Sequence, residues 1–295
     1  MSVRGTGPQG RDADLCEHSA ALRRRLEPER RAGRSVGFVP TMGALHDGHL
    51  SLVRAARAEC DVVVASVFVN PLQFAPGEDF EAYPRDLEGD RDLLRAEGAD
   101  AVLAPARAEL APPELATTVR VAGVTEGLEG AHRPGHFDGV ATIVTKLLHI
   151  VWPDRAYFGE KDYQQLVVVR RLVADLDLPV SVVGCPTVRE PDGLAMSSRN
   201  AYLSPGERAQ SLALSRALFA VREAWDGDAD FARALLHRRL DGAPGVRLDY
   251  AEVCDPDTLE PLEGVTQGPA RALVAAHVGP ARLIDNIRLD PPGAG

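Results

Sequence analysis

Two histidines three residues apart stand where an apolar run meets a helical pattern. The stretch "FVPTMGALHDGH" contains His46 and His49, with Gly43 and Gly48 close by. Residues three apart share a helix face, and a helix start presents unpaired N–H groups and a positive dipole end. Imidazoles can donate to phosphate oxygens, and glycines let a ligand approach the backbone closely. The pattern predicts a nucleotide site; the alternatives are a chance pair or half of a metal site.

Two later segments carry groups that suit phosphate. "FGEKD" places Lys161 directly after an apolar run, and "AMSSRN" contains Ser197, Ser198 and Arg199. A lysine is a movable point charge, and a fork-shaped guanidinium beside hydroxyls can hold several phosphate oxygens. The alternatives are a solvated lysine and a polar linker.

Neutral amides occur in two further places. "FVNPLQF" contains Asn70 and Gln73, and "DYQQL" contains Gln164 and Gln165. Amides can bind the hydroxyl and carboxylate of a hydroxy acid without repelling its charge. Taken alone, these glutamines could equally be ordinary surface residues.

The elements that must position these residues alternate between strand and helix. Apolar runs predict strands over 35–40, 61–70, 100–105, 154–160 and 179–188. Helical periodicity predicts helices over 13–32, 49–60, 86–97, 139–151 and 162–176. This alternation predicts an α/β fold, a Rossmann-like doubly wound parallel sheet with right-handed crossovers. Ligands of such sheets bind at the carboxyl ends of the strands, which is where several of these residues fall.

The character of the chain changes near residue 189. Ser204, Pro205 and Glu207 form a capping-box signature at the start of a helix predicted over 204–225. A second helix is predicted over 228–241, with β-type runs at 246–253, 271–278 and 281–288. We therefore predict a Rossmann-like domain over 13–189 and a smaller α+β lid domain over 190–290. Flexible tails are predicted over 1–12 and 291–295.

Composition narrows the class of protein. The chain has 295 residues and a net charge of −10, which argues against a large nucleic-acid-binding surface. No apolar run approaches the roughly 20 residues of a membrane span, and the first residues lack the apolar core of a signal peptide, so we expect a cytoplasmic protein. Four dispersed cysteines without a C-x-x-C pair predict buried, reduced thiols.

Six stretches, taken together and in order, closely resemble the pantothenate synthetase (pantoate–β-alanine ligase) family. They are "PTMGALHDGH", "FVNPLQF", "YPRDLEGD", "RPGHFDGVATIVTKLL", "FGEKDYQQL" and "MSSRNAYLS", and the resemblance covers about residues 35–290. The wider group is the nucleotidyltransferases with a H-x-G-H signature, related in fold to class I aminoacyl-tRNA synthetases. The resemblance implies that ATP activates pantoate as pantoyl-adenylate with release of pyrophosphate, and that β-alanine then displaces AMP to give pantothenate.

The resemblance also implies roles for individual residues. His49 matches a proton donor and His46 its phosphate-contacting partner, and Lys161 and Arg199 match phosphate contacts, so these four are implied to be catalytic. The positions that match ATP-contacting segments are Pro40, Thr41, Met42, Gly43, Ala44, Leu45, His46, Asp47, Gly48, His49, Gly159, Glu160, Lys161, Asp162, Val188, Met196, Ser197, Ser198 and Arg199. Those implied to bind pantoate or β-alanine, within the 13–189 domain, are Gln73, Gln165, Asn70, Arg133 and His136.

Magnesium and a homodimer are implied as well. The family's adjacent acidic or polar residues after Y-P-R are interrupted here, because Gly89 separates Glu88 from Asp90. We expect Mg²⁺ to be held mainly through ATP oxygens, with Asp90 assisting. Two alternatives stay open: another H-x-G-H adenylyltransferase that activates a different small carboxylic acid, and a non-catalytic nucleotide-binding relative. The net charge disfavours a tRNA-charging enzyme.

Overall fold

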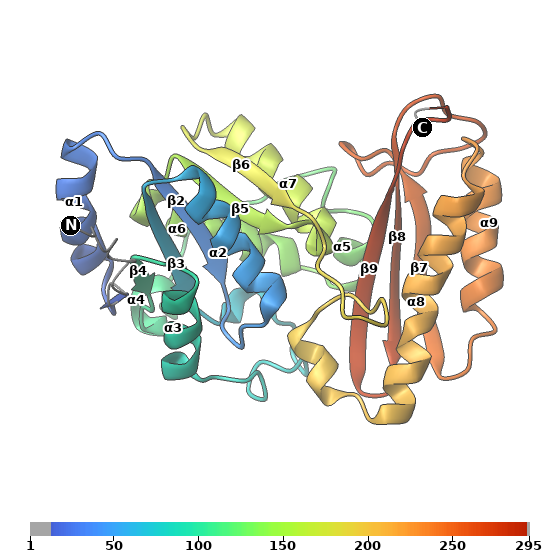
Figure 1. The fold of residues 1–295 in the computed structure, drawn as a ribbon, viewed down its shortest axis with the longest axis horizontal. Coiled ribbons are helices and arrows are strands. Elements are labelled where there is room, and N and C mark those ends of the chain that lie inside the picture. The colour runs from blue at the N-terminus through green and yellow to red at the C-terminus, as the bar shows by residue number, and fades with distance from the viewer. Residues whose placement is uncertain (1–12, 294–295) are drawn as a thin grey trace, which may run out of the picture. The chain divides into compact units, whose positions relative to one another are not determined.

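The computed structural model describes residues 13–293, which form two compact units (Figure 1). The predicted tail over 1–12 lies outside the described residues, as do 294 and 295. The first unit runs as far as Arg120 and adds Asp138–Phe158 and Leu172–Cys185. The second unit comprises Val121–Phe137, Gly159–Arg171 and the chain from Pro186 onward. The division into 13–189 and 190–290 stays a prediction.

The first unit is built on a six-stranded sheet with the order β1-β4-β3-β2-β5-β6. Its strands are β1 (Asp14–Cys16), β2 (Val36–Thr41), β3 (Val62–Val67), β4 (Ala101–Leu103), β5 (Arg155–Gly159) and β6 (Ser181–Cys185). The pairs β1–β4, β4–β3, β3–β2 and β2–β5 are parallel. The strands β2 and β3 are almost wholly buried, which is typical of a sheet covered on both faces. The predicted α/β fold is confirmed.

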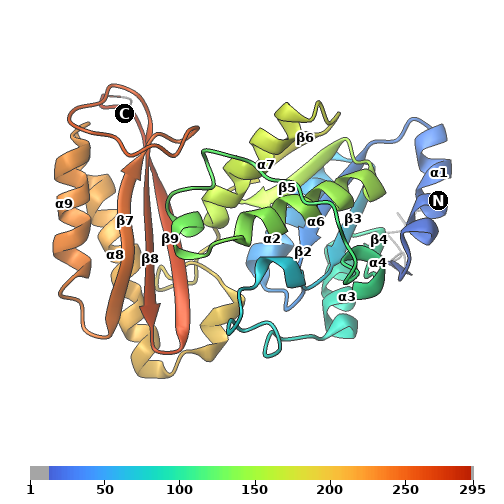
Figure 2. The ribbon, with the colours of Figure 1, turned by 180° about the vertical axis from the view of Figure 1, so that it is seen from behind.

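Helices cover both faces of this sheet. This unit contains α1 (Ser19–Arg31), α2 (Asp47–Glu59), α3 (Leu87–Ala96), the short α4 (Arg107–Leu110) and most of α6 (His136–Val151). α2 and α3 lie on the face nearer the viewer in Figure 1, and α6 lies on the face seen in Figure 2. Leu52, Val53 and Ala56 of α2 pack with buried residues of β2 and β3. The four cysteines are buried and free, as predicted.

Two of the predicted boundaries were wrong. The expected helix over 13–32 begins only at Ser19, because Asp14–Cys16 form the edge strand β1 instead. β1 pairs with β4, which lies more than 80 residues further along the chain, so no local pattern could reveal it. The expected strand over 61–70 ends at Val67, and Pro71 begins the short 3₁₀ turn η1 (Pro71–Gln73).

The second unit contains a three-stranded antiparallel sheet with the order β7-β8-β9. The strands are β7 (Val246–Cys254), β8 (Ala270–Val278) and β9 (Ala281–Leu289). α8 (Pro205–Ala224) and α9 (Ala229–Leu240) pack on one face of it, against alternate residues such as Ala272, Val274 and Ala276 (Figures 1 and 2). The predicted capping box at Ser204 and Glu207 is confirmed.

The opposite face of this second sheet carries several charged and amide side chains, and we call it the polar face. Period-2 alternation places Arg271 and His277 of β8 on that face, with Arg282 and Asn286 of β9 beside them. The other elements that belong to this unit are α5 (Glu129–His132), η2 (Glu160–Asp162), most of α7 (Tyr163–Asp175) and η3 (Ser198–Tyr202). Charged side chains from this polar face bond to α5 and η2.

Candidate active site

The two histidines of the opening stretch lie at the point where the strand order of the first sheet reverses. The chain proceeds from β2 outward to β3 and β4, and later returns to place β5 on the other side of β2. Ligands of open α/β sheets bind at this switch point, beyond the carboxyl ends of the strands. β2 ends at Thr41, and α2 begins at Asp47 with His46 as its N-cap. The turn between them is therefore well placed for a ligand.

The two imidazoles lie together, as their spacing predicts. The centroids of the His46 and His49 rings are 4.1 Å apart and their planes differ by 35°. The backbone N–H of His46 donates to Nδ1 of His49 at 3.4 Å. Because Nδ1 accepts, the proton of a neutral His49 ring is on Nε2. His49 can therefore act as a hydrogen-bond donor without a net positive charge.

A buried carboxylate shapes the turn between β2 and α2. Asp90 on α3 is 4% exposed, and its two oxygens accept from the N–H groups of Ala44 at 3.0 Å and Leu45 at 2.9 Å. Ala44 has a φ of 51° and Gly43 a φ of 84°, a left-handed conformation that disfavours most side chains. A Cβ at Gly43 would lie 2.7 Å from Asp90 Oδ2, so only glycine leaves room for this anchor. Burial raises the pKa of Asp90, although the two N–H bonds oppose that shift.

Other predicted ATP contacts in this unit are on the same junction. Pro40 and Thr41 end β2, and the Thr41 hydroxyl donates to the carbonyl of Ser66 on β3 at 2.6 Å. Met42 lies in the turn, and Gly48 lies in the first turn of α2. Asp47, by contrast, pairs with Arg54 on the same helix at 2.7 Å. The predicted stretch thus forms the end of β2, the turn that follows it and the start of α2.

Asn70 is committed to internal hydrogen bonds. It is 3% exposed, its Oδ1 accepts from Leu72 N–H, and its Nδ2 donates to the carbonyl of Gly139 on α6 at 3.1 Å. Nδ2 also donates to Oε1 of Gln73 at 2.9 Å. A backbone donor and a backbone acceptor fix the orientation of the Asn70 amide, which in turn fixes that of Gln73. The acceptor oxygen of Gln73 therefore points to Asn70, and its amide NH2 group points away from Asn70.

Lys161 and the neighbouring glutamines Gln164 and Gln165 belong to the second unit. Lys161 lies in η2, its side chain is 21% exposed, and its ammonium is 3.6 Å from Asp162 Oδ1. Gln164 is buried and fully used, because its amide bonds to Glu129 N–H and to the carbonyls of Val124 and Gly127. Gln165 is partly exposed, and its amide has no hydrogen-bond partner among the described residues. The family resemblance implies Gln165, and not Gln164, as the substrate contact. Of these two side chains, only that of Gln165 has an amide available to a ligand.

Arg133 and His136 also lie close together in this unit. Arg133 Nη1 is 3.3 Å from Nε2 of His136, at the start of α6. The preceding helix α5 is held by Glu129, whose carboxylate accepts from the Tyr250 hydroxyl at 3.0 Å and from Arg282 at 2.6 Å. The sequence reasoning did not single out Glu129, Tyr250 or Arg282. Tyr250 and Arg282 are polar residues in predicted β-type runs, and Glu129 lies in a segment for which no element was predicted, so no local signal indicated that these side chains meet.

The segment that follows β6 brings the remaining predicted ATP contacts together. The N–H of Met196 donates to the carbonyl of Val188 at 3.0 Å, so these positions are adjacent although eight residues apart. Ser197 caps η3, because its hydroxyl accepts from Arg199 N–H. Beside Val188, Arg189 forms a bidentate pair with Asp285 at 2.7 and 2.8 Å. Ser198 and Arg199 lie in η3.

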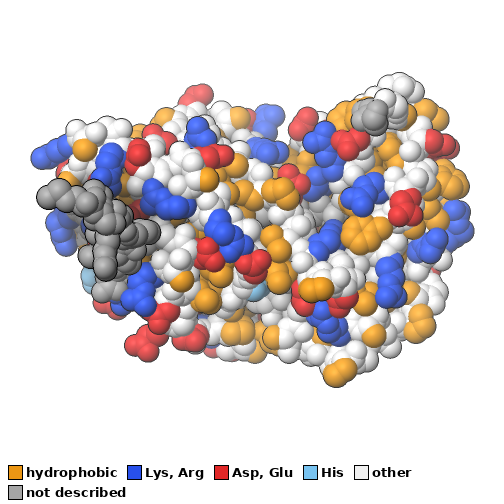
Figure 3. Space-filling model, viewed as in Figure 1, with side chains coloured by type: hydrophobic (Ala, Val, Ile, Leu, Met, Phe, Trp, Pro, Cys, Tyr) orange, Lys and Arg blue, Asp and Glu red, His pale blue; other side chains and the backbone are white. Residues whose placement is uncertain are grey.

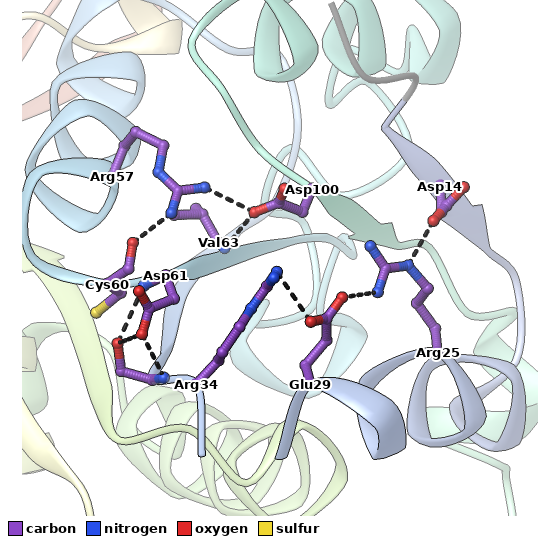
Figure 4. Close-up of polar contacts among 10 residues, drawn as sticks. Asp14, Arg25, Glu29, Arg34, Arg57, Cys60, Asp61, Val63 and Asp100 are labelled. Carbon is purple, nitrogen blue, oxygen red and sulfur yellow. Dashed lines mark hydrogen bonds and ion pairs between the residues drawn. The ribbon is translucent and has the colours of Figure 1, made fainter. Parts of the chain in front are cut away.

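A cavity at the opposite, amino edge of the first sheet is a poor binding site. Its volume is about 520 Å³, and Arg34, Arg57 and Asp61 are among the residues that line it. Figure 4 shows that its arginines are already paired, Arg34 with Glu29 and Arg57 with Asp100. The two arginines of the cavity are therefore already occupied by carboxylates of the protein.

The described part of the chain contains neither a cluster of metal-binding side chains nor a membrane-spanning helix. Within residues 13–293, no group of three or more His, Cys, Asp or Glu side chains could hold a metal ion. Over the same residues, the helices are too short or too polar to cross a bilayer. On the face drawn in Figure 3, basic and acidic side chains are interspersed.

Comparisons with known proteins identify the family to which this chain belongs. A family model described as Pantoate-beta-alanine ligase matches residues 14–288. A pantothenate synthetase of Acidobacterium capsulatum is 58% identical over 268 residues, which are 90% of this chain and 89% of that protein. One of Moorella thermoacetica is 51% identical over 94% of this chain and 99% of that protein.

Solved structures of two relatives have the same fold. The crystal structure of pantothenate synthetase from Thermus thermophilus has a TM-score of 0.89 and 53% identity, covering 94% of this chain and 100% of that one. The pantoate–β-alanine ligase of Francisella tularensis, in complex with β,γ-ATP and β-alanine, has a TM-score of 0.75 and 31% identity over 93% of this chain and 97% of that one. With a family model that spans almost the whole chain and relatives above 50% identity, this chain belongs to the pantoate–β-alanine ligase family and is a ligase of pantothenate biosynthesis.

Proposed function

We propose that the residues described above carry out the two half-reactions of ATP-dependent pantothenate synthesis. In the first, a carboxylate oxygen of (R)-pantoate attacks the α-phosphorus of ATP, and the bond to the bridging oxygen breaks, so that the electron pair leaves on pyrophosphate. In the second, the amine of β-alanine attacks the acyl carbon of pantoyl-adenylate, loses a proton and expels AMP. Neither step needs a protein nucleophile, so positioning and electrostatics carry the catalysis.

The His46–His49 pair is proposed to stabilise the phosphates as negative charge moves onto the leaving pyrophosphate. The observation that carries this proposal is the pair's position at the start of α2, beyond the carboxyl end of β2 at the switch point of the sheet. The helix N-terminus adds N–H donors and the positive end of its dipole. With Nδ1 occupied as an acceptor, His49 would donate from Nε2. Such preorganised donors contribute most where charge develops.

Lys161 and Arg199 are proposed to be the cationic contacts to the phosphates. Both are on short 3₁₀ turns, η2 and η3, in the second unit. An ammonium can follow a moving phosphate as a point charge, whereas a guanidinium binds two oxygens in a fixed fork. Val188 and Met196 are joined by a backbone hydrogen bond. Both are proposed to contact the adenosine part of ATP.

Gln73 and Gln165 are proposed to bind pantoate. The Asn70 amide holds the acceptor oxygen of Gln73, so Gln73 would offer N–H donors to the oxygen atoms of its ligand. Gln165 offers an amide with both functions. Asn70, predicted as a direct ligand, is better supported as a residue that orients Gln73. Arg133 and His136 stay proposed contacts near the substrates.

Magnesium, the oligomeric state and the location are also proposals. Mg²⁺ would neutralise charge on ATP, held mainly by phosphate oxygens, because both oxygens of Asp90 already accept backbone bonds. A homodimer, a cytoplasmic location and closure of a lid domain over 190–290 rest on the resemblance and on the sequence.

A substrate-omission experiment tests the proposal. Pyrophosphate release from ATP should require pantoate but not β-alanine, and AMP and pantothenate should appear only when all three substrates are present. The alternative adenylyltransferase would release pyrophosphate with another carboxylic acid and not with pantoate. A non-catalytic relative would bind ATP and release none.

A further inference from the structure

The polar face of the β7-β8-β9 sheet contains two side chains whose burial calls for an explanation. Arg271 on β8 is 4% exposed and Asn286 on β9 is 3% exposed. Burying a charge or an amide is costly unless its hydrogen bonds are satisfied, so such residues mark a specific arrangement. Neither residue is among those that the sequence or the family resemblance indicated. Both of them contact the turn that carries Lys161.

Asn286 holds the backbone of that turn. Its Nδ2 donates to the carbonyl of Glu160 at 2.9 Å and to the carbonyl of Lys161 at 2.8 Å. Its Oδ1 accepts from Nε of Arg271 at 2.7 Å. Because two partners can only accept and the third can only donate, one orientation of the amide satisfies all three bonds. The carbonyls of η2 are thus fixed to the sheet.

Arg271 holds the same turn from both sides. One of its terminal nitrogens donates to Glu160 Oε2 at 2.9 Å. Its guanidinium also lies over the ring of Tyr163, 3.9 Å from the centroid, at the start of α7. Arg271 therefore contacts the residue before Lys161 and the residue two positions after it, while the Lys161 ammonium takes part in none of these bonds.

We infer that Arg271 and Asn286 are positioning residues for Lys161 in the ligase reaction. This inference rests on the proposed phosphate role of Lys161. A lysine side chain is long and flexible, so its ammonium is placed accurately only if the backbone from which it starts is rigid. The polar face of the C-terminal sheet supplies that rigidity through Asn286 and Arg271. The C-terminal sheet would then contribute to the adenylation step by positioning Lys161.

The test measures pantoate-dependent ATP–pyrophosphate exchange in the full-length Asn286→Asp variant. Aspartate can still pair with Arg271, but it has no N–H to offer and places negative charge against two carbonyl oxygens. The expected result is that kcat/KM for ATP falls about 10- to 100-fold, as for other small misplacements of catalytic groups. Arg271→Lys, which keeps the charge but loses the fork, is expected to give a smaller loss in the same parameter.

Val274→Ala is the matched control for simple destabilisation. Val274 is on the same strand as Arg271, fully buried, but on the face that packs against α8 and α9. The variant should lower the unfolding midpoint and leave kcat/KM for ATP unchanged. If Val274→Ala reduces kcat/KM as much as Asn286→Asp does at an equal midpoint, the positioning role is refuted.

A double variant separates this inference from the proposed function. If Asn286 acts through Lys161, Lys161→Ala with Asn286→Asp should be no slower than Lys161→Ala alone, and additive losses would overturn the inference. If the Lys161→Ala variant keeps the wild-type rate of ATP–pyrophosphate exchange, the proposed phosphate role of Lys161 is refuted instead. Amide hydrogen exchange over 159–163 then decides: faster exchange in Asn286→Asp than in Val274→Ala supports the anchor, and equal exchange excludes it.

Discussion

The turn at His46–His49 and the turn at Lys161 are held in place by complementary groups. In the first unit, the carboxylate of Asp90 accepts from the N–H groups of Ala44 and Leu45. In the second unit, the amide of Asn286 donates to the carbonyls of Glu160 and Lys161. One turn is anchored by a side chain that accepts hydrogen bonds from its N–H groups. The other is anchored by a side chain that donates hydrogen bonds to its carbonyls.

The surroundings of the two anchors differ as well. The first turn is backed by the apolar contacts of α2 with β2 and β3, and Asp90 is its single buried acid. The second turn is backed by a network of an arginine, an asparagine and a glutamate on a sheet face. In both turns, backbone groups that form no regular secondary structure are satisfied by a polar side chain of an adjacent element.

The largest expected effect is at the first turn itself. His49→Ala should lower pantoyl-adenylate formation by about a thousandfold, because it removes a donor aimed at developing charge, while ATP still binds. Single-turnover formation of the adenylate measures this loss. His149→Ala, at an exposed histidine of the same unit, is the control and should behave as wild type. Wild-type turnover in His49→Ala would show that the pair is not catalytic.

The anchor of the first turn should have the next largest effect. Asp90→Asn replaces one acceptor oxygen by an amide NH2 group, which cannot accept a hydrogen bond from the backbone. We expect kcat/KM for ATP to fall about 10- to 100-fold. Asp92→Asn, an exposed acid on the same helix, is the matched control and should change little.

The same variant distinguishes an anchor from a metal ligand. If Asp90 acts through the backbone, hydrogen exchange at Ala44 and Leu45 should become faster and added Mg²⁺ should not restore activity. Recovery at high Mg²⁺ with unchanged exchange would instead support the predicted role of Asp90 beside the metal.

Asn70→Asp tests the orientation of the Gln73 amide. The aspartate can accept from Leu72 N–H but cannot donate to Gly139 or to Gln73, so the Gln73 amide loses its fixed orientation. We expect KM for pantoate to rise about tenfold, which corresponds to about one buried hydrogen bond, with KM for ATP unchanged. In a Gln73→Ala background the same substitution should have no further effect on KM for pantoate. An equal rise in both backgrounds would contradict the orienting role.

The smallest effect concerns pH and the polar face of the second sheet. Burial lowers the pKa of His277 from its usual 6.5, although Asp249 opposes this shift. The folded protein therefore binds this proton less tightly than the unfolded chain. His277 contributes stability above pH 6.5, and this is lost as the pH falls through the lowered pKa.

His277→Gln should flatten the decline in thermal stability below neutral pH by less than about 1 kcal/mol, because the side chain is partly exposed. Thermal unfolding at a series of pH values measures the slope, and His237→Gln on the exposed part of α9 is the control. An unchanged slope would show that His277 is not a source of the pH dependence. The Asp90 anchor has the opposite sign, because its raised pKa makes its contribution decline as the pH rises from 3.8.

The local parts of the fold and the site could be predicted from the sequence. A short apolar run predicted β2, a valine-rich run predicted β3, and the Ser204–Glu207 capping box predicted the start of α8. The spacing of His46 and His49 placed their rings side by side. These features depend on residues within one or two turns of each other, for which the chain's own periodicity is sufficient.

The long-range anchors could not be predicted in the same way. Asn70 was predicted to contact a substrate, and nothing local showed that its amide would donate to the carbonyl of Gly139. Asn286 lies more than 120 residues from Lys161 along the chain and sits in a β-type run whose polar residues could equally have faced solvent. Only the pairing of strands and the packing of a third element decide which face of a strand is buried.

The sequence by itself determined the class of fold, the chemistry available at each turn and the family to which the order of motifs points. It did so because hydrophobic periodicity, helix capping and residue type act over short stretches of chain. The tertiary structure alone decided which polar groups are consumed internally and which stay available to a ligand. A buried amide or carboxylate is defined by its partners, and for Asn70, Asp90, Arg271 and Asn286 those partners include groups distant in the chain.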